Sequence, residues 1–129
     1  MTIAHTGIIV PKAIVSEVVA WYLKALEPLG YKKLLEHGDS VFGLGDKPFE
    51  ADWWIVGGDI STGIASHHAF HSPDRAKVEA FYKAAIDAGA KDNGPPGIRA
   101  QYHPNYYAAF VIDLAGNNIE VMTMAPPEE

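Results

Sequence analysis

The stretch HHAFHSPDRAKVEAFYKAAIDAG, residues 67–89, decides the fold, because a strand-like run leads directly into an amphipathic segment. The apolar residues of the second part recur at the spacing of one helix face: Val78, Phe81, Tyr82, Ala85 and Ile86. We expect Ser72 to cap this helix, Pro73 to occupy its first position and Gly89 to follow its end. The stretch therefore predicts a strand followed closely by a helix.

The first half of the chain repeats this order. The run IAHTGIIV (residues 3–10) leads through Pro11 to EVVAWYLKALEPLG (residues 17–30), where we expect Ser16 to cap a helix that ends near Pro28. Three strand-like runs follow each helix: residues 31–37, 40–45 and 51–57, then 98–102, 106–114 and 117–123. The sequence thus predicts an α+β fold of two βαβββ repeat units, unit one at about 1–60 and unit two at about 65–125.

Composition excludes several classes of function. The 129-residue chain has no cysteine, which rules out disulfides, thiolate zinc sites and a cysteine nucleophile and suits the reducing cytoplasm. Its formal net charge of -6, with no cluster of lysine and arginine, argues against nucleic acid as a partner. Apolar runs fall well short of the ~20 residues of a membrane span, and the N-terminus does not resemble a signal peptide. We expect a single cytoplasmic domain, residues 1–129.

Three polar residues stand out on the predicted strands. Glu120 alternates with Ile119 and Val121, and burying a carboxylate is costly unless a cation or hydrogen-bond donors accompany it. His5 and His68 hold matching places in the first strand of each unit, and symmetric strands meet near the pseudo-twofold axis. We expect these three side chains to converge on a divalent metal ion (Zn, Ni, Mn, Co or Fe(II)). The alternatives are histidines that are hydrogen-bonded or exposed, and a solvated glutamate.

These features together resemble the vicinal oxygen chelate superfamily, which includes glyoxalase I, fosfomycin resistance proteins, extradiol dioxygenases, methylmalonyl-CoA epimerase and bleomycin-binding proteins. The residues that carry the resemblance are His5, the run of residues 67–90 and the ending YYAAFVIDLAGNNIEVM, residues 106–122. The resemblance implies half-barrels that form a curved mixed sheet around a metal-centred cavity, with the helices outside. It also implies His5, His68 and Glu120 as metal ligands, with Glu120 as catalytic base. His67 is then expected on the opposite face, and His71 in an ordinary polar role.

A fourth ligand is not expected. Glyoxalase I-like proteins take one from the last strand of the first unit, and the repeat offset from Glu120 leads there to Trp53, which cannot ligate a metal. Asp52 would serve only if the strand register shifted by one residue, which turns a side chain to the other face. The turn at residues 113–117 reads DLAGN where the family usually has Asp-Pro-Asp-Gly-Asn, and we expect this to affect loop rigidity and not the ligands.

The segment DNGPPGIRAQYHPNYY, residues 92–107, predicts a loop over the mouth of a pocket, since turn formers are followed by aromatic residues. Residues expected to bind an anionic or aromatic substrate are Trp54, Arg99, Tyr102, His103 and Tyr106. The alternative is that the tyrosines pack on strands. Trp53 and Trp54 belong either to the core or to the pocket wall, and strand alternation allows only one to face the cavity.

The favoured function is that of a glyoxalase-like metalloenzyme of the lyase or isomerase type, which chelates neighbouring oxygens of a small substrate, with glutathione as a possible co-substrate. One alternative is an extradiol-type dioxygenase, because two histidines and a carboxylate are also the Fe(II) pattern. The other is a metal-free protein that sequesters drugs, like the bleomycin resistance proteins. We expect a homodimer, whose site closes either within a chain or with His5 of a second copy.

Overall fold

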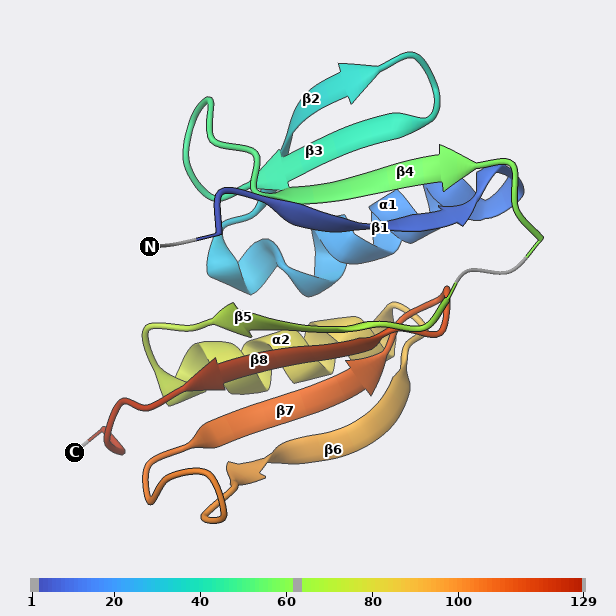
Figure 1. The fold of residues 1–129 in the computed structure, drawn as a ribbon. Helices are drawn as coiled ribbons and strands as arrows, with labels where there is room; N and C mark the ends of the chain where they lie inside the picture. The colour runs from blue at the N-terminus through green and yellow to red at the C-terminus, as the bar shows by residue number, and fades with distance from the viewer. Residues whose placement is uncertain (1–2, 62–63, 129) are drawn as a thin grey trace.

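The computed structural model describes residues 3–61 and 64–128, which form two similar units (Figure 1). The first unit consists of β1 (Thr6–Pro11), α1 (Val15–Ala25), β2 (Lys32–His37), β3 (Val41–Gly45) and β4 (Trp53–Gly58), with short 3-10 turns at Lys12–Ile14 and Glu27–Leu29. The second unit consists of β5 (His67–His71), α2 (Arg75–Asp87), β6 (Lys91–Ile98), β7 (Tyr107–Ile112) and β8 (Asn118–Thr123). No helix of these described ranges is both long and apolar enough to cross a bilayer.

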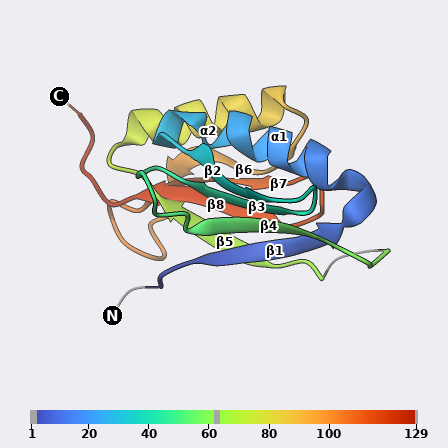
Figure 2. The ribbon, with the colours of Figure 1, turned by 90° about the horizontal axis from the view of Figure 1, so that it is seen from above.

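Each unit builds its own four-stranded mixed sheet, with strand orders β1-β4-β3-β2 and β5-β8-β7-β6. The first strand of each unit pairs in parallel with the last one, and the other pairs are antiparallel. β1 and β5 lie alongside each other in opposite directions where the units meet, yet belong to separate sheets (Figures 1 and 2). The predicted α+β fold of two βαβββ units is confirmed, and the sheets do not close into a barrel.

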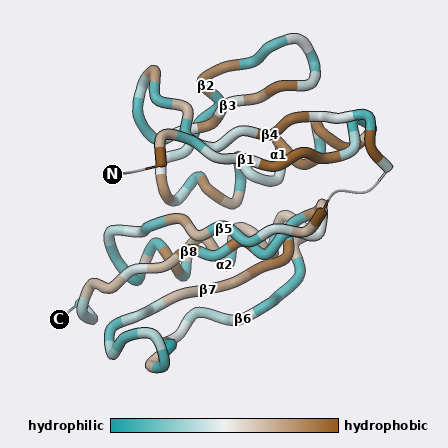
Figure 3. The backbone as a smooth tube through the Cα atoms, in the orientation of Figure 1, coloured by the Kyte–Doolittle hydropathy of each residue, from teal (hydrophilic) through white to brown (hydrophobic). Residues whose placement is uncertain are grey.

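Both helices cover the same side of the two sheets (Figure 2). We call the opposite side the open face. Ala109, Val111, Ile119 and Val121 of β7 and β8 are fully buried under α2, which removes their apolar surface from water and stabilises the fold. Hydropathy follows this arrangement, since β7 is largely hydrophobic and the edge strand β6 largely hydrophilic (Figure 3).

Two buried hydrogen bonds join the units through α1. The indole nitrogen of Trp21 donates to the carbonyl oxygen of Ala85 at 3.1 Å, and the Tyr22 hydroxyl donates to the carboxylate of Asp113. Burial, and then the charge of Asp113, raise the pKa of Tyr22 well above its ordinary value. The junction therefore combines apolar packing with two paired polar groups, although the indole nitrogen of Trp53 is buried there without a partner among the residues described.

The predicted N-terminal caps of both helices and the placing of Pro73 at the first helical position were wrong, whereas Gly89 follows the end of α2 as expected. The N-cap residue of α2 is Asp74, whose side chain accepts a 2.8 Å hydrogen bond from the backbone nitrogen of Lys77. The Ser72 hydroxyl donates to the backbone carbonyl oxygen of Asp74. Ser16 lies inside α1, because the 3-10 turn after Pro11 leads into the helix at Val15 without a side-chain cap.

The segment that follows α2 also differs from prediction. Residues 91–98 form β6, although they contain Gly94-Pro95-Pro96-Gly97, and the strand ends where one was expected to begin. β6 is an edge strand with two register shifts, and an edge strand tolerates proline because its outward N–H positions need no partner.

Candidate functional site

Glu120 is a buried carboxylate on the open face of the second unit. Its partners in register are Ala69 of β5 and Phe110 of β7, whereas its neighbours Ile119 and Val121 point to the helices. Only 3% of Glu120 is exposed, although it faces away from the helices. A buried carboxylate requires donors or a cation, so its contacts define the candidate site.

Each carboxylate oxygen of Glu120 has a partner. The His67 Nε2 lies 3.1 Å from Oε1, and the Tyr106 hydroxyl donates to Oε2. Burial, and then the hydrogen bond to Glu120, raise the pKa of Tyr106 to about 12. Tyr106 therefore remains protonated near neutral pH and keeps its role as donor.

The imidazole of His67 faces an acceptor at both nitrogens. Its Nδ1 lies 3.0 Å from the carbonyl oxygen of Asn118, and because a carbonyl only accepts, Nδ1 carries the proton. Nε2 then faces a carboxylate oxygen, and two facing acceptor atoms at this distance need a shared proton or a metal ion between them. On the same face, the Asn118 Oδ1 is buried and has no hydrogen-bond partner among the residues described.

His68 does not share a face with Glu120, so this expectation was wrong. In the parallel pairing of β5 with β8, His68 lies level with Ile119 and shares its side of the sheet, and its ring contacts that of Trp53 at a centroid distance of 4.8 Å. Its Nε2 hydrogen-bonds the Ser66 hydroxyl at 2.9 Å, and burial lowers its pKa. His67, expected on the opposite face, is the histidine that contacts Glu120, because successive strand residues alternate between faces.

The same strand register defines the equivalent positions of the first unit. In this register Thr6 pairs with Trp53. Trp54 therefore holds the same position relative to His5 that Glu120 holds relative to His67. The ring of Trp54 lies 6.3 Å from that of His5, whereas Trp53 is only 1% exposed on the helix side. A shallow hollow of about 320 Å³ lies on this open face, and its walls are mainly apolar: His5, Thr6, Gly7, Ile8, Ile9, Trp54 and Val56.

The three predicted ligands do not converge within one chain. Across residues 3–61 and 64–128, no three histidine, aspartate or glutamate side chains are close enough together to hold a metal ion. The described part of the chain thus brings two potential ligands together, His67 and Glu120, and leaves His5 exposed in the other unit.

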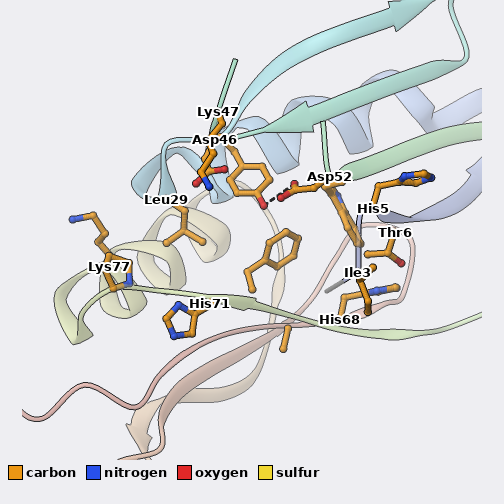
Figure 4. A pocket seen from close by; sticks show the side chains of 15 residues that line it. Ile3, His5, Thr6, Leu29, Asp46, Lys47, Asp52, His68, His71 and Lys77 are labelled. Atoms are coloured by element: carbon orange, nitrogen blue, oxygen red, sulfur yellow. Dashed lines mark hydrogen bonds between the residues drawn. The ribbon is translucent and has the colours of Figure 1, made fainter. Parts of the chain in front are cut away.

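A separate cleft of about 660 Å³ lies between the two units (Figure 4). His68 and His71 line it, and His5 lies at its edge beside the hollow of the first unit. Asp52, considered above as a fourth ligand, accepts a 2.8 Å hydrogen bond from the Tyr31 hydroxyl there. Burial and this bond raise the pKa of Tyr31. The histidines that line this cleft, His5, His68 and His71, are therefore not the one that contacts Glu120.

The predicted substrate-binding residues occupy different places. Tyr102 is 66% exposed with its ring 5.2 Å from that of Tyr106, and the guanidinium of Arg99 lies 5.2 Å from the ring centre of Phe110. The His103 Nδ1 accepts from the backbone of Asn105 and so closes a turn.

Sequence reasoning missed Phe110 and Asn118 as parts of this surface. Strand alternation around Glu120 could have indicated Asn118, because residues two apart share a face.

Comparisons with known proteins agree with this architecture. No family model matches the sequence, and no curated protein is similar enough to match. A glyoxalase/bleomycin resistance protein from Albidiferax ferrireducens T118 superposes with a TM-score of 0.74 at 20% identity, covering 94% of this chain and 98% of that one. A glyoxalase/bleomycin resistance protein/dioxygenase family enzyme from Burkholderia phytofirmans PsJN gives 0.73 at 17% identity, covering 97% and 100%.

A lactoylglutathione lyase from Agrobacterium tumefaciens also superposes, with a TM-score of 0.65 at 16% identity, covering 95% of this chain and 92% of the other. Similarity over nearly the full length of each chain, at low identity, establishes a shared fold and leaves the reaction open. The protein has the fold of the vicinal oxygen chelate superfamily.

Proposed function

We propose that this protein is a metal-dependent, glyoxalase-like enzyme in which His67 and Glu120 of one chain and His5 of a second copy hold a divalent metal ion. The observation that carries the proposal is the 3.1 Å distance between His67 Nε2 and Glu120 Oε1. The other ring nitrogen of His67, Nδ1, is hydrogen-bonded to the carbonyl oxygen of Asn118. His67 replaces His68 of the original prediction, because only His67 contacts the carboxylate.

The two side chains fit a metal ion without rearrangement. Two atoms bonded to one ion at about 2.0–2.2 Å would lie roughly 3–3.5 Å apart, so the observed 3.1 Å between His67 Nε2 and Glu120 Oε1 is compatible with a shared ion. A metal-binding histidine usually donates its other N–H to a carbonyl or carboxylate, as His67 does toward Asn118.

A second copy would supply the third ligand. His5 is exposed and holds the position equivalent to His67, beside a side chain, Trp54, that cannot ligate. The surface around it is apolar, with Ile9 61% exposed, which favours a partner over open water. We therefore propose a homodimer in which the open face of unit one covers the open face of unit two from the other chain.

A bound divalent ion would act as a Lewis acid toward two neighbouring oxygens of a small substrate. Glu120 would serve as the base that accepts a proton from the substrate only with its Oε1 released from the metal ion, because the Tyr106 hydroxyl already occupies Oε2. Tyr106 would hold the carboxylate in one rotamer by its hydrogen bond to Oε2. The resulting reaction class is proton transfer of the lyase or isomerase type.

Metal binding by the purified protein tests the ligand assignment. Titration with Zn(II), Ni(II), Co(II), Mn(II) and anaerobic Fe(II) should give a site that His67→Ala and Glu120→Gln weaken by about tenfold or more, as expected for loss of a ligand. His68→Ala is the matched control, because its ring lies on the other side of the sheet. Equal affinities in the wild type and the His67→Ala variant would refute the assignment.

Mixing two inactive variants tests the shared site. His5→Ala chains and Glu120→Gln chains each lack a ligand, but a mixed dimer has one site in which every ligand is intact. An equal mixture, exchanged through mild denaturation, should recover about a quarter of the wild-type sites if subunits pair at random. No recovery, with both variants dimeric, would place His5 outside the site.

Substrate screens separate the reaction classes. Turnover of the hemithioacetal of glutathione and methylglyoxal would support the glyoxalase-like reaction with glutathione as co-substrate. Oxygen uptake with catechols after Fe(II) loading would instead assign an extradiol-type dioxygenase. Tight binding of a drug such as bleomycin by metal-free protein, unchanged by His67→Ala, would assign a sequestration protein.

A further inference from the structure

The guanidinium of Arg99 is bound by backbone carbonyls of the edge strand β6. The Nη1 donates to the carbonyl oxygen of Gly97 and the Nη2 to that of Pro95, each at 2.8 Å. A Cβ at Gly94 would lie 3.0 Å from Nη2, and one at Gly97 would lie 3.3 Å from Nη1. The two glycines of the GPPG segment therefore leave the space in which the guanidinium lies.

The guanidinium lies on the open face of the second unit. The Arg99 Cζ lies 5.2 Å from the ring centre of Phe110, whose register partner is Glu120. The His67 imidazole stacks on the same phenyl ring, with the ring centres 6.3 Å apart. The phenyl ring of Phe110 thus lies next to both the guanidinium of Arg99 and the imidazole of His67.

Among the residues that the structure describes, Arg99 forms no ion pair with an acidic side chain. In the described part of the chain, no carboxylate oxygen lies within 4.0 Å of the guanidinium, and the four ion pairs found there involve other residues. An arginine has five N–H donors in a fixed fork, and the backbone carbonyls occupy two of them. A half-buried, immobilised guanidinium with free donors is suited to a planar anion such as a carboxylate.

We propose that Arg99 binds the carboxylate of the substrate, so that the substrate is a small, planar carboxylic acid. The ring of Phe110 provides an aromatic surface beside the guanidinium, which suits an aromatic or conjugated acid. The opposite end of such a molecule lies toward His67 and Glu120. Its identification as a substrate rests on the proposed function, whereas binding of the anion does not require a metal.

Binding of benzoate and benzamide to protein freed of metal by a chelator tests this proposal. The two probes share shape and differ in charge, so titration followed by NMR should show benzoate binding at least about tenfold more tightly, as for one charge-assisted hydrogen-bond pair. Arg99→Gln should abolish this preference and leave benzamide unchanged. Arg99→Lys should keep a weaker preference, because it retains the charge and loses the fork.

Arg75→Gln is the matched control, since Arg75 also lies over an aromatic ring, that of Tyr107 at 4.9 Å, and donates to a backbone carbonyl. It should retain the full preference for benzoate. The proposal is overturned if the wild type binds benzoate and benzamide equally, a comparison that needs no variant. It is also overturned if a folded Arg99→Gln variant still prefers benzoate. Because the measurement excludes metal, its outcome is independent of the metal titrations.

Discussion

Trp54 holds, in the strand register of the first unit, the position that Glu120 holds in the second. The duplicated units thus present unlike faces: one has a histidine and a carboxylate in contact, and the other has a histidine beside an indole. In the proposed dimer, these unlike faces meet across the chain boundary. The site then has an apolar wall from one copy and two ligands from the other.

Replacing Trp54 by glutamate should add a fourth ligand to the proposed site. We expect Trp54→Glu to raise affinity for Zn(II) or Ni(II) by about tenfold or more, since one more carboxylate would face the ion. Trp53→Glu is the comparison, because it buries a charge on the helix side and should destabilise the fold by about 4 kcal/mol or more. Competition titration and urea unfolding measure the two effects. A gain in affinity from Trp53→Glu would contradict the register.

Tyr106→Phe should destabilise the protein by about 1–3 kcal/mol, because the buried Oε2 of Glu120 loses its donor. The free energy of unfolding in urea measures this loss. Tyr102→Phe should change it by less than about 0.5 kcal/mol, as for other exposed positions. Equal effects of the two variants would mean that the hydroxyl of Tyr106 contributes nothing to holding the carboxylate.

Asp74→Ala should cost about 1 kcal/mol of stability, since the backbone nitrogen of Lys77 loses its side-chain acceptor at the start of α2. Ser16→Ala should have little effect, because Ser16 caps no helix end. Thermal unfolding of both variants checks the assignment. If Ser16→Ala is the more harmful change, the start of α1 is misplaced.

Stability should fall as the pH rises above about 10, and Tyr22 should contribute to the fall. Its pKa in the folded protein is raised, so the unfolded chain releases this proton first and the stabilisation is lost with increasing pH. The slope from one such tyrosine reaches about 1.4 kcal/mol per pH unit. Urea midpoints from pH 8 to pH 11 should decline less steeply for Tyr22→Phe than for the wild type or Tyr102→Phe. Parallel slopes in all three would exclude this contribution.

The repeated order of elements could be predicted from sequence because it depends on local signals. Helical spacing in residues 75–87, and the glycines that follow each helix with positive φ at Gly30 and Gly89, were sufficient to place both units. β6 was missed because Pro95 and Pro96 usually interrupt strands, and sequence does not reveal that a strand lies at an edge.

The choice between His67 and His68 could not be made from alternation alone. β5 has a histidine on each face, and only its pairing with β8 shows which one lies beside Glu120. Glu120 itself was recognisable, because a carboxylate between two fully buried apolar neighbours requires partners. Whether His5 reaches this carboxylate depends on a second chain, which no pattern within one sequence determines.

The bonds from Trp21 to Ala85 and from Tyr22 to Asp113 make each half of the chain depend on the other. A polypeptide of one half alone would leave an indole and a phenol without acceptors, or an aspartate without its phenolic donor. Such a half would therefore be less stable alone than together with the other half. Cutting the chain between the halves should therefore yield fragments that regain structure together and not separately.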